Sequence, residues 1–206
     1  MENKKKKVYI TFLKDDLKQL EEEANYLGIA KTNYIFLILY LNRNNKLLVK
    51  DIQQYKALLE NNSNQKKNLY IDLTAYLSTL HADKPRDVYS FNQYLSALIH
   101  LHLKQHTLPR TNQKREMIRK GFTVPTYISE KFDEILEKTA IYSKTLITYT
   151  LLTEDIEYHQ KNYSSNDTKK IFLQYPINFD KFIPNNKNQK VELLEFVLNK
   201  FDEIID

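Results

Sequence analysis

Four short segments of the chain each combine an alternating apolar pattern with a helical pattern that begins directly afterwards. They span residues 7–12, 68–73, 121–124 and 170–175. A strand this short cannot form a sheet alone, so each of the four needs a partner strand. Internal repetition of this kind constrains the architecture more than any single residue does. The sequence therefore predicts four strand-helix-helix repeats whose strands combine into two pairs.

The composition favours a fold made mainly of helices. Two glycines and five prolines in 206 residues are too few for a turn-rich β-sandwich. The absence of cysteine excludes disulfides and thiolate metal sites. We therefore predict a mainly α fold with short β-ribbons, in which four repeats form two intramolecular pseudo-dimers.

The sequence lacks the features of a membrane or secreted protein. Its longest apolar run, residues 34–41, is far shorter than the roughly 20 residues needed to span a bilayer. The polar, basic start of the chain leads into a strand pattern and not into the apolar stretch of a signal peptide. We expect a cytoplasmic protein with no membrane contact.

The first repeat shows the pattern most clearly. In its strand Val8, Ile10 and Phe12 share one face, the period of two expected when one face is buried. From residue 14 onward apolar residues are spaced three and four apart, as on one side of a helix, and Gly28 supplies a left-handed cap. Residues 34–41 are apolar on every side, which favours a second helix enclosed by another repeat, with a buried strand as the alternative.

The other three repeats keep the same order with different spacing. The second helix starts at Ser90 in the second repeat, where serine is a favoured N-cap, and at Ser143 in the third. In the fourth repeat, Pro176 and Pro184 compress the first helix. We expect a first module at 1–105, with repeats at 1–44 and 66–104 joined by a linker helix at 45–60, and a second module at 106–206, with repeats at 115–153 and 168–206.

The order strand, helix, turn, helix, with a polar outer strand face, resembles the ribbon-helix-helix family of DNA-binding proteins. The nearest local matches are residues 8–12 for the strand and 28–35 for the turn between helices, with similar turns at 89–95 and 142–147. In that family two repeats pair their strands into an antiparallel ribbon that enters the DNA major groove. Outward strand residues read base edges there, and the start of the second helix holds a phosphate.

The resemblance assigns roles to individual residues of this chain. Outward strand positions would read bases: in the first module Lys7, Tyr9, Thr11, Asn68, Tyr70 and Asp72, and in the second Lys120, Thr123, Lys170, Phe172 and Gln174. Phosphates would be held at helix starts by Lys31, Thr32, Ser90, Ser143 and Lys144. The net charge of +5 is compatible with a polyanionic partner. No catalytic residue, metal site or cofactor is expected.

Three residues depart from the family pattern. Asp72 faces the same way as the readers, where it either accepts from a cytosine amino group or marks a ribbon that no longer binds. Pro125 follows the third strand closely, a position tolerated only at an edge or an end. Phe172 offers apolar contact alone, for example to a thymine methyl. The second module is therefore expected either to bind DNA or to serve oligomerisation or partner binding.

Three other patterns are considered as functional sites: a histidine string, two carboxylate clusters and a lysine run. His100 and His102 flank Leu101 as in nicking relaxases, but on a helix residues two apart point in widely different directions. The carboxylates at 21–23 and 154–157 are typical of a solvated helix face. The lysine run 4–7 is interpreted as a solvated tail, with an arm on the phosphate backbone as the alternative.

The predicted function is sequence-specific binding of double-stranded DNA without enzymatic activity. Fused repeats in one chain resemble the accessory proteins that mark a plasmid transfer origin for a relaxase. A transcriptional repressor or a plasmid copy or partition regulator is the alternative within the family, and a scaffold that binds only proteins is the alternative outside it. The resemblance also implies a relaxase or other plasmid-processing partner and self-association on DNA. If both modules bind, their sites should lie about 10 base pairs apart or a multiple of that.

Overall fold

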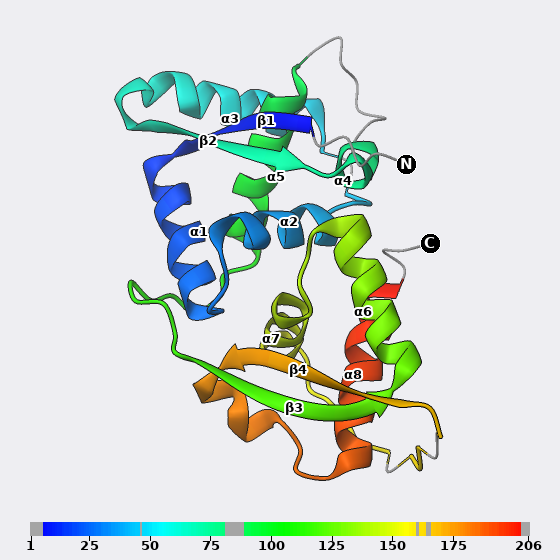
Figure 1. Cartoon of the computed structure of the whole chain (residues 1–206). Helices are drawn as coiled ribbons and strands as arrows, with labels where there is room; N and C mark the ends of the chain where they lie inside the picture. Colours follow the sequence, from blue (N-terminus) through cyan, green and yellow to red (C-terminus); the bar gives the residue numbers. More distant parts are fainter. Residues whose placement is uncertain (1–5, 46, 81–88, 160, 164–165, 203–206) are drawn as a thin grey trace. The chain divides into compact units, whose positions relative to one another are not determined.

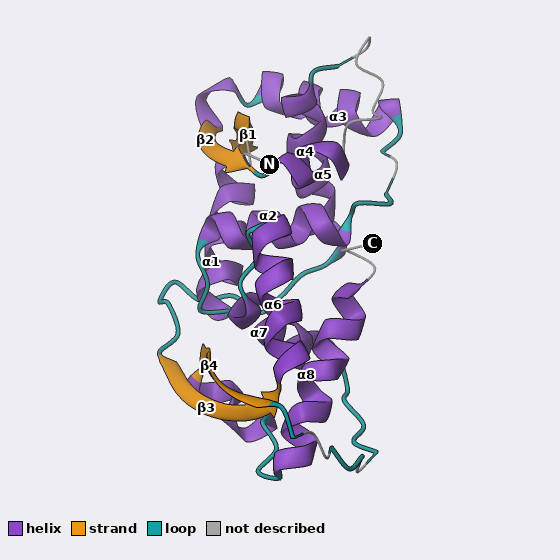
Figure 2. Cartoon of the chain, turned by 45° about the vertical axis from the view of Figure 1, so that its right-hand side comes forward, coloured by secondary structure: helices purple, strands orange, loops and turns teal. Residues whose placement is uncertain are grey.

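The structure is a computed structural model that describes residues 6–45, 47–80, 89–159, 161–163 and 166–202. This part of the chain is mainly helical and contains two two-stranded antiparallel ribbons, each strand of which is followed by helices (Figure 1; Figure 2). Its contacts divide the chain into a first module, Met1–Tyr26 with Ala30–Gln113, and a second module, Leu27–Ile29 with Lys114–Asp206. None of the described helices is both long and apolar enough to cross a membrane.

The first ribbon pairs β1 (Lys6–Leu13) with β2 (Lys66–Leu73), and Tyr9 lies opposite Tyr70. The alternation predicted for both strands is confirmed, because each strand turns its apolar residues to the core and its polar ones outward. The buried inward residues are Val8, Ile10, Phe12, Ile71 and Leu73.

Two pairs of helices follow the strands of the first module. They are α1 (Lys14–Tyr26) with α2 (Lys31–Leu41), and α4 (Ala75–Leu80) with α5 (Phe91–Gln105). The turn after α1 places Gly28 at a φ of 69°, the left-handed conformation predicted for it. The sequence also predicts a turn containing Pro85 before the second helix of this repeat, and that segment lies outside the described residues.

The apolar run at residues 34–41 lies in α2, so the strand alternative is wrong. Every side chain from Tyr34 to Tyr40 is buried. Contacts with α1, α4 and α5 enclose the helix, as its uniform apolarity requires.

The predicted linker helix is α3 (Val49–Asn61), and it belongs to the core of the first module. Ile52, Tyr55 and Leu59 are buried on the side that contacts α5, and the short 3-10 helix η1 (Ser63–Gln65) then leads into β2. The Tyr55 hydroxyl accepts a hydrogen bond from the Leu13 N–H at 3.4 Å and lies 3.5 Å from the carbonyl oxygen of Thr11. On the same strand the Thr11 N–H donates to Ser96 Oγ of α5 at 3.1 Å. Side chains of α3 and α5 therefore protect the edge of β1 that β2 leaves open.

A buried carboxylate near the start of α1 connects these elements. The Asp16 side chain accepts a hydrogen bond from the Tyr55 hydroxyl at 3.1 Å and lies 2.7 Å from His100 Nδ1 of α5. The Tyr55 and His100 rings stack with centroids 4.4 Å apart. Asp16 is only 1% exposed, so this network of α1, α3 and α5 is largely closed to water.

Glu23 lies in the carboxylate cluster 21–23, and the prediction of a solvated face is wrong for it. Its side chain is fully buried and accepts hydrogen bonds from the Tyr34 hydroxyl at 2.7 Å and from Gln19 Nε2 at 2.8 Å. Arg110 Nε lies 3.6 Å from the same carboxylate. Burial raises the pKa of Glu23, against the lowering effect of these three neighbours.

The second module is built around β3 (Met117–Pro125) paired with β4 (Thr168–Pro176). Pro125 is the last residue of β3, where its missing N–H is tolerated. Helices α6 (Thr126–Thr139) and α7 (Ser143–Thr153) follow β3. After β4 the expected first helix is reduced to the 3-10 helix η2 (Ile177–Phe182), and α8 (Lys187–Asp202) ends the described chain.

The second helix of three repeats contacts the strand of the neighbouring repeat. In the first module α5, which follows β2, contacts β1. In the second module α7, which follows β3, contacts β4, and α8, which follows β4, contacts β3. The strands β1, β3 and β4 therefore each contact a helix that follows the partner strand of their ribbon.

Candidate nucleic-acid interface

All six predicted base readers of the first module lie on the outward face of the β1–β2 ribbon. They form three directly opposite pairs: Lys7 with Asp72, Tyr9 with Tyr70, and Thr11 with Asn68. Thr11 is half-buried and the other five side chains are exposed. The pairing register, which no local pattern specifies, decides these partners.

Two of the three pairs have a defined geometry. The Thr11 hydroxyl donates to Asn68 Oδ1 at 2.9 Å, which orients the amide so that its Nδ2 group is left to donate elsewhere. The rings of Tyr9 and Tyr70 are tilted by 52°, with centroids 6.2 Å apart. The centre of the outward face is therefore aromatic, and polar pairs flank it on both sides.

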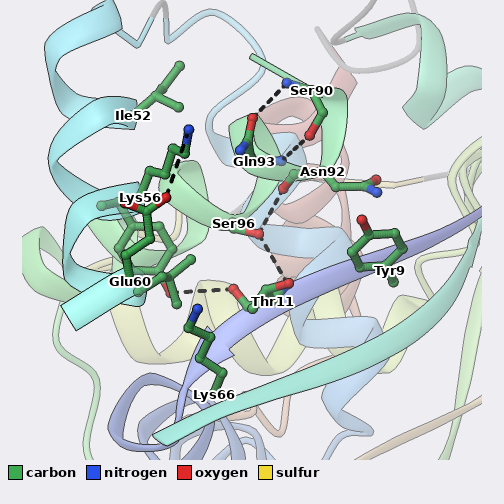
Figure 3. A pocket seen from close by; sticks show the side chains of 12 residues that line it. Tyr9, Thr11, Ile52, Lys56, Glu60, Lys66, Ser90, Asn92, Gln93 and Ser96 are labelled. Atoms are coloured by element: carbon green, nitrogen blue, oxygen red, sulfur yellow. Dashed lines mark hydrogen bonds and ion pairs between the residues drawn. The ribbon is translucent and has the colours of Figure 1, made fainter. Parts of the chain in front are cut away.

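A pocket of about 220 Å³ opens beside this face, next to Tyr9 and Thr11 (Figure 3). The start of α5 lines one side through Ser90, Asn92 and Gln93. The other lining residues come from α3, from the start of β2 and from the next turn of α5: Ile52, Tyr55, Lys56, Leu59, Glu60, Lys66 and Ser96.

The predicted phosphate-binding residues have different surroundings. Ser90 lies at the pocket beside the ribbon, where its Oγ accepts from the Gln93 N–H at 3.2 Å and its own N–H donates to Gln93 Oε1 at 2.8 Å. Lys31 forms an ion pair with Glu21 at 3.3 Å, next to a half-buried Thr32 in the first turn of α2. The structure thus assigns Ser90 a capping role that the sequence already suggested.

The third repeat starts its second helix differently. Ser143 is the first residue of α7, and the N-cap is Tyr142, which has no side-chain cap hydrogen bond. The Lys144 ammonium lies 5.5 Å from the centre of the Tyr142 ring.

Replacing Ser90 with alanine should destabilise the protein by about 1 kcal/mol, because the N-cap hydroxyl is lost. Ser143→Ala removes a hydroxyl at the equivalent helix start without removing a cap, and it should change stability by less than about 0.5 kcal/mol. Urea unfolding followed by circular dichroism measures both. Equal losses in the two variants would contradict the capping role of Ser90.

On the second ribbon, the predicted reader Lys120 does not share the outward face with the other predicted readers. It pairs in register with the buried Leu173, and its ammonium contacts Asp180 at 2.6 Å, which holds the pKa of that carboxyl below its ordinary value. Residues 119, 121 and 123 share the outward face because strand residues alternate, so the outward placement predicted for Lys120 is wrong.

The outward face of the second ribbon consists of Arg119 opposite Gln174, Gly121 opposite Phe172, and Thr123 opposite Lys170. All six residues are exposed. The Phe172 ring has the Arg119 guanidinium 4.6 Å and the Lys170 ammonium 5.4 Å from its centre. These pairs contain two cations and no carboxylate, whereas the corresponding pairs of the first ribbon include Asp72. Strict alternation back from Thr123 was the signal that would have identified Arg119.

The two histidines of the relaxase-like string lie on helix α5 and contact different partners. His100 contacts Asp16, while His102 Nδ1 lies 2.9 Å from Asn42 Nδ2. Burial lowers the pKa of His102 to about 4, with a contribution from the neighbouring His106. Within the described ranges, no group of three or more histidine or carboxylate side chains is placed to hold a metal ion.

Comparison with known proteins finds no relative of this chain. No protein-family model matches the chain, and no curated protein or solved structure matches it either.

Proposed function

We propose that the protein binds double-stranded DNA sequence-specifically by placing its β-ribbons in the major groove. The observation that carries this proposal is the outward face of the β1–β2 ribbon, where six polar and tyrosine side chains form three opposite pairs. A two-stranded ribbon fits the major groove, whose donor and acceptor pattern distinguishes all four base pairs. Lys6 and Lys67 are exposed near opposite ends of the ribbon and can approach phosphates.

Each module is proposed to be a pseudo-dimer of two repeats in one chain. The contacts of α5 with β1, α7 with β4 and α8 with β3 support this arrangement, because a helix from each of these repeats lies on the strand of its partner. The two halves of a ribbon carry different readers, as Lys7 opposite Asp72 illustrates. Such a protein is suited to an asymmetric site, which a symmetric homodimer reads less well.

Selection of bound duplexes from a random pool tests the proposal. The full-length protein should enrich a defined sequence, and the double variant Tyr9→Ala, Thr11→Ala should lose preference at two or more positions of it. A good base contact contributes about 1–3 kcal/mol of discrimination, or roughly 5- to 150-fold. Affinity should also fall steeply as salt rises, because counterions are released when lysine and arginine meet phosphates.

A matched control is the double variant Gln53→Ala, Gln54→Ala, which changes two exposed residues of α3. It should enrich the same sequence as the unchanged protein. The proposal is wrong if no duplex is enriched, or if the ribbon variant keeps the full preference. Binding that is indifferent to salt would favour a protein-binding scaffold instead.

Two neighbouring cations of the second ribbon provide an independent test of DNA binding. Arg119→Ala should weaken DNA binding by roughly 5- to 150-fold, because arginine on an outward face is suited to guanine O6 and N7. Lys120→Ala should leave affinity within about twofold, since Lys120 contacts Asp180 on the other face. Fluorescence anisotropy with the selected duplex measures both. Equal effects of the two changes would contradict DNA binding by the second ribbon.

For the biological role we propose an accessory protein at a plasmid transfer origin, with a relaxase as its partner. A repressor or a copy or partition regulator is the alternative. The position of the selected sequence distinguishes them: beside the nicking site for an accessory protein, and over a promoter or replication origin for a regulator.

A further inference from the structure

The centre of the first ribbon exposes two aromatic side chains. Tyr9 is 45% exposed and Tyr70 is 65% exposed, and the two lie opposite each other at the middle of the outward face. Within the described part of the chain, neither hydroxyl has a hydrogen-bond partner. Two phenol rings with free hydroxyls are thus presented side by side to a ligand.

The surroundings of this tyrosine pair indicate a polyanionic ligand. Lys7 lies on the same face toward one end of the ribbon, directly opposite Asp72, and Lys66 lies on it at the other end. Lys6 and Lys67 are exposed at positions that alternate with the outward residues, and they leave each end of the ribbon with a net positive charge. An aromatic centre between cationic ends complements a nucleic acid, whose bases lie between charged backbones.

The chemistry of a tyrosine side chain matches one base edge in particular. In the major groove, thymine presents a hydrogen-bond acceptor, O4, directly beside an apolar C5-methyl group, and no other DNA base carries that methyl. A tyrosine presents the complementary order, an apolar ring that ends in a hydroxyl donor. The ring can cover the methyl while the hydroxyl donates to O4. The ring centroids are 6.2 Å apart, which is close to two base-pair steps of about 3.4 Å, so both rings can reach base pairs at the centre of one site.

We propose that the Tyr9–Tyr70 pair recognises pyrimidine 5-methyl groups, so that the preferred duplex carries thymine under the centre of the first ribbon. This inference rests on the proposed function and deepens it by naming the base at the centre of the site. The flanking pairs, Lys7 with Asp72 and Thr11 with Asn68, read the base pairs on either side.

The test replaces single thymines of the selected duplex with deoxyuridine, which removes the methyl and keeps O4. At one or two central positions the affinity should fall about fourfold, the factor that corresponds to about 0.8 kcal/mol for one buried methyl-sized group. The variant Tyr9→Ala, Tyr70→Ala should bind the thymine and deoxyuridine duplexes equally. The variant Tyr9→Phe, Tyr70→Phe keeps both rings and should retain the fourfold difference, while binding both duplexes more weakly.

The outcomes separate this inference from the proposed function. If no duplex is enriched in the selection, DNA reading itself is wrong. If a duplex is enriched but every deoxyuridine substitution is neutral, or if the difference survives in the double alanine variant, methyl recognition alone is wrong. Equal affinity for the single strand of the same sequence would also overturn it, because stacking on bases would then explain the exposed rings.

Discussion

Replacing Asp16 with alanine should destabilise the protein by about 2–5 kcal/mol, because two hydrogen-bonding partners lose their acceptor and each buried donor left unsatisfied costs about 1–3 kcal/mol. The carboxylate is 1% exposed and contacts both Tyr55 and His100. Without it, the Tyr55 hydroxyl loses its closest acceptor, and that hydroxyl also holds the open edge of β1. We expect a lower urea midpoint by circular dichroism and faster amide exchange along β1 by mass spectrometry.

Asp15 is the matched control, because it occupies the same first turn of α1 but is exposed. Asp15→Ala should cost less than about 1 kcal/mol, the range for an exposed charge at a helix start. Asp16→Asn, which keeps the shape of the side chain, should fall between the two alanine variants. If Asp16→Ala and Asp15→Ala unfold at the same urea concentration, the buried network does not stabilise the protein.

Glu23→Ala should cost about 3 kcal/mol, since each buried donor left without an acceptor costs about 1–3 kcal/mol. The donors concerned are the Tyr34 hydroxyl and Gln19 Nε2, which lie in α2 and α1. Glu21→Ala is the control: Glu21 is exposed and forms a surface ion pair with Lys31, which is worth at most about 1 kcal/mol. Urea unfolding of the two variants at neutral pH measures the difference.

Glu23 should also make stability depend on pH. Burial raises its pKa above the ordinary value of 4.5, so the folded protein holds the proton more tightly than the unfolded chain does. The stability from the protonated form is fully present below the unfolded pKa and is lost as pH rises through the folded pKa. Glu23→Gln cannot ionise. The free energy of unfolding of the unchanged protein, minus that of Glu23→Gln, should therefore fall as pH rises above 4.5; a constant difference would contradict the raised pKa.

Local periodicity predicted most of the secondary structure. The alternation in the first strand placed Val8, Ile10 and Phe12 inward, and the uniformly apolar run at 34–41 predicted an enclosed helix. Both signals depend only on residues within a few positions of each other. The placement of Lys120 was wrong because residue 120 precedes the predicted strand 121–124, and the alternation was not extended back to it. The observed strand begins at Met117 and makes the alternation unambiguous.

The surroundings of polar side chains could not be predicted in the same way. The glutamates at 21–23 look alike in sequence, yet Glu23 is buried because Tyr34 and Arg110 approach it. The helix predicted at 45–60 was expected as a linker, and the role of the observed α3 at the edge of β1 depends on the hydroxyl of Tyr55. Neither the partners of Glu23 nor those of Tyr55 follow from the spacing of residues along the chain.

The sequence by itself determined which residues of the first two strands face inward, because periodicity is a property of a continuous segment. It thereby placed all six candidate readers of the first ribbon on the outward face. Only the tertiary structure decided which of them lie opposite each other, and which charged groups are buried. Thr11 and Asn68 are 57 positions apart, and Asp16 and His100 are 84 apart. Contacts over such separations follow from how the whole module packs, and no local pattern specifies them.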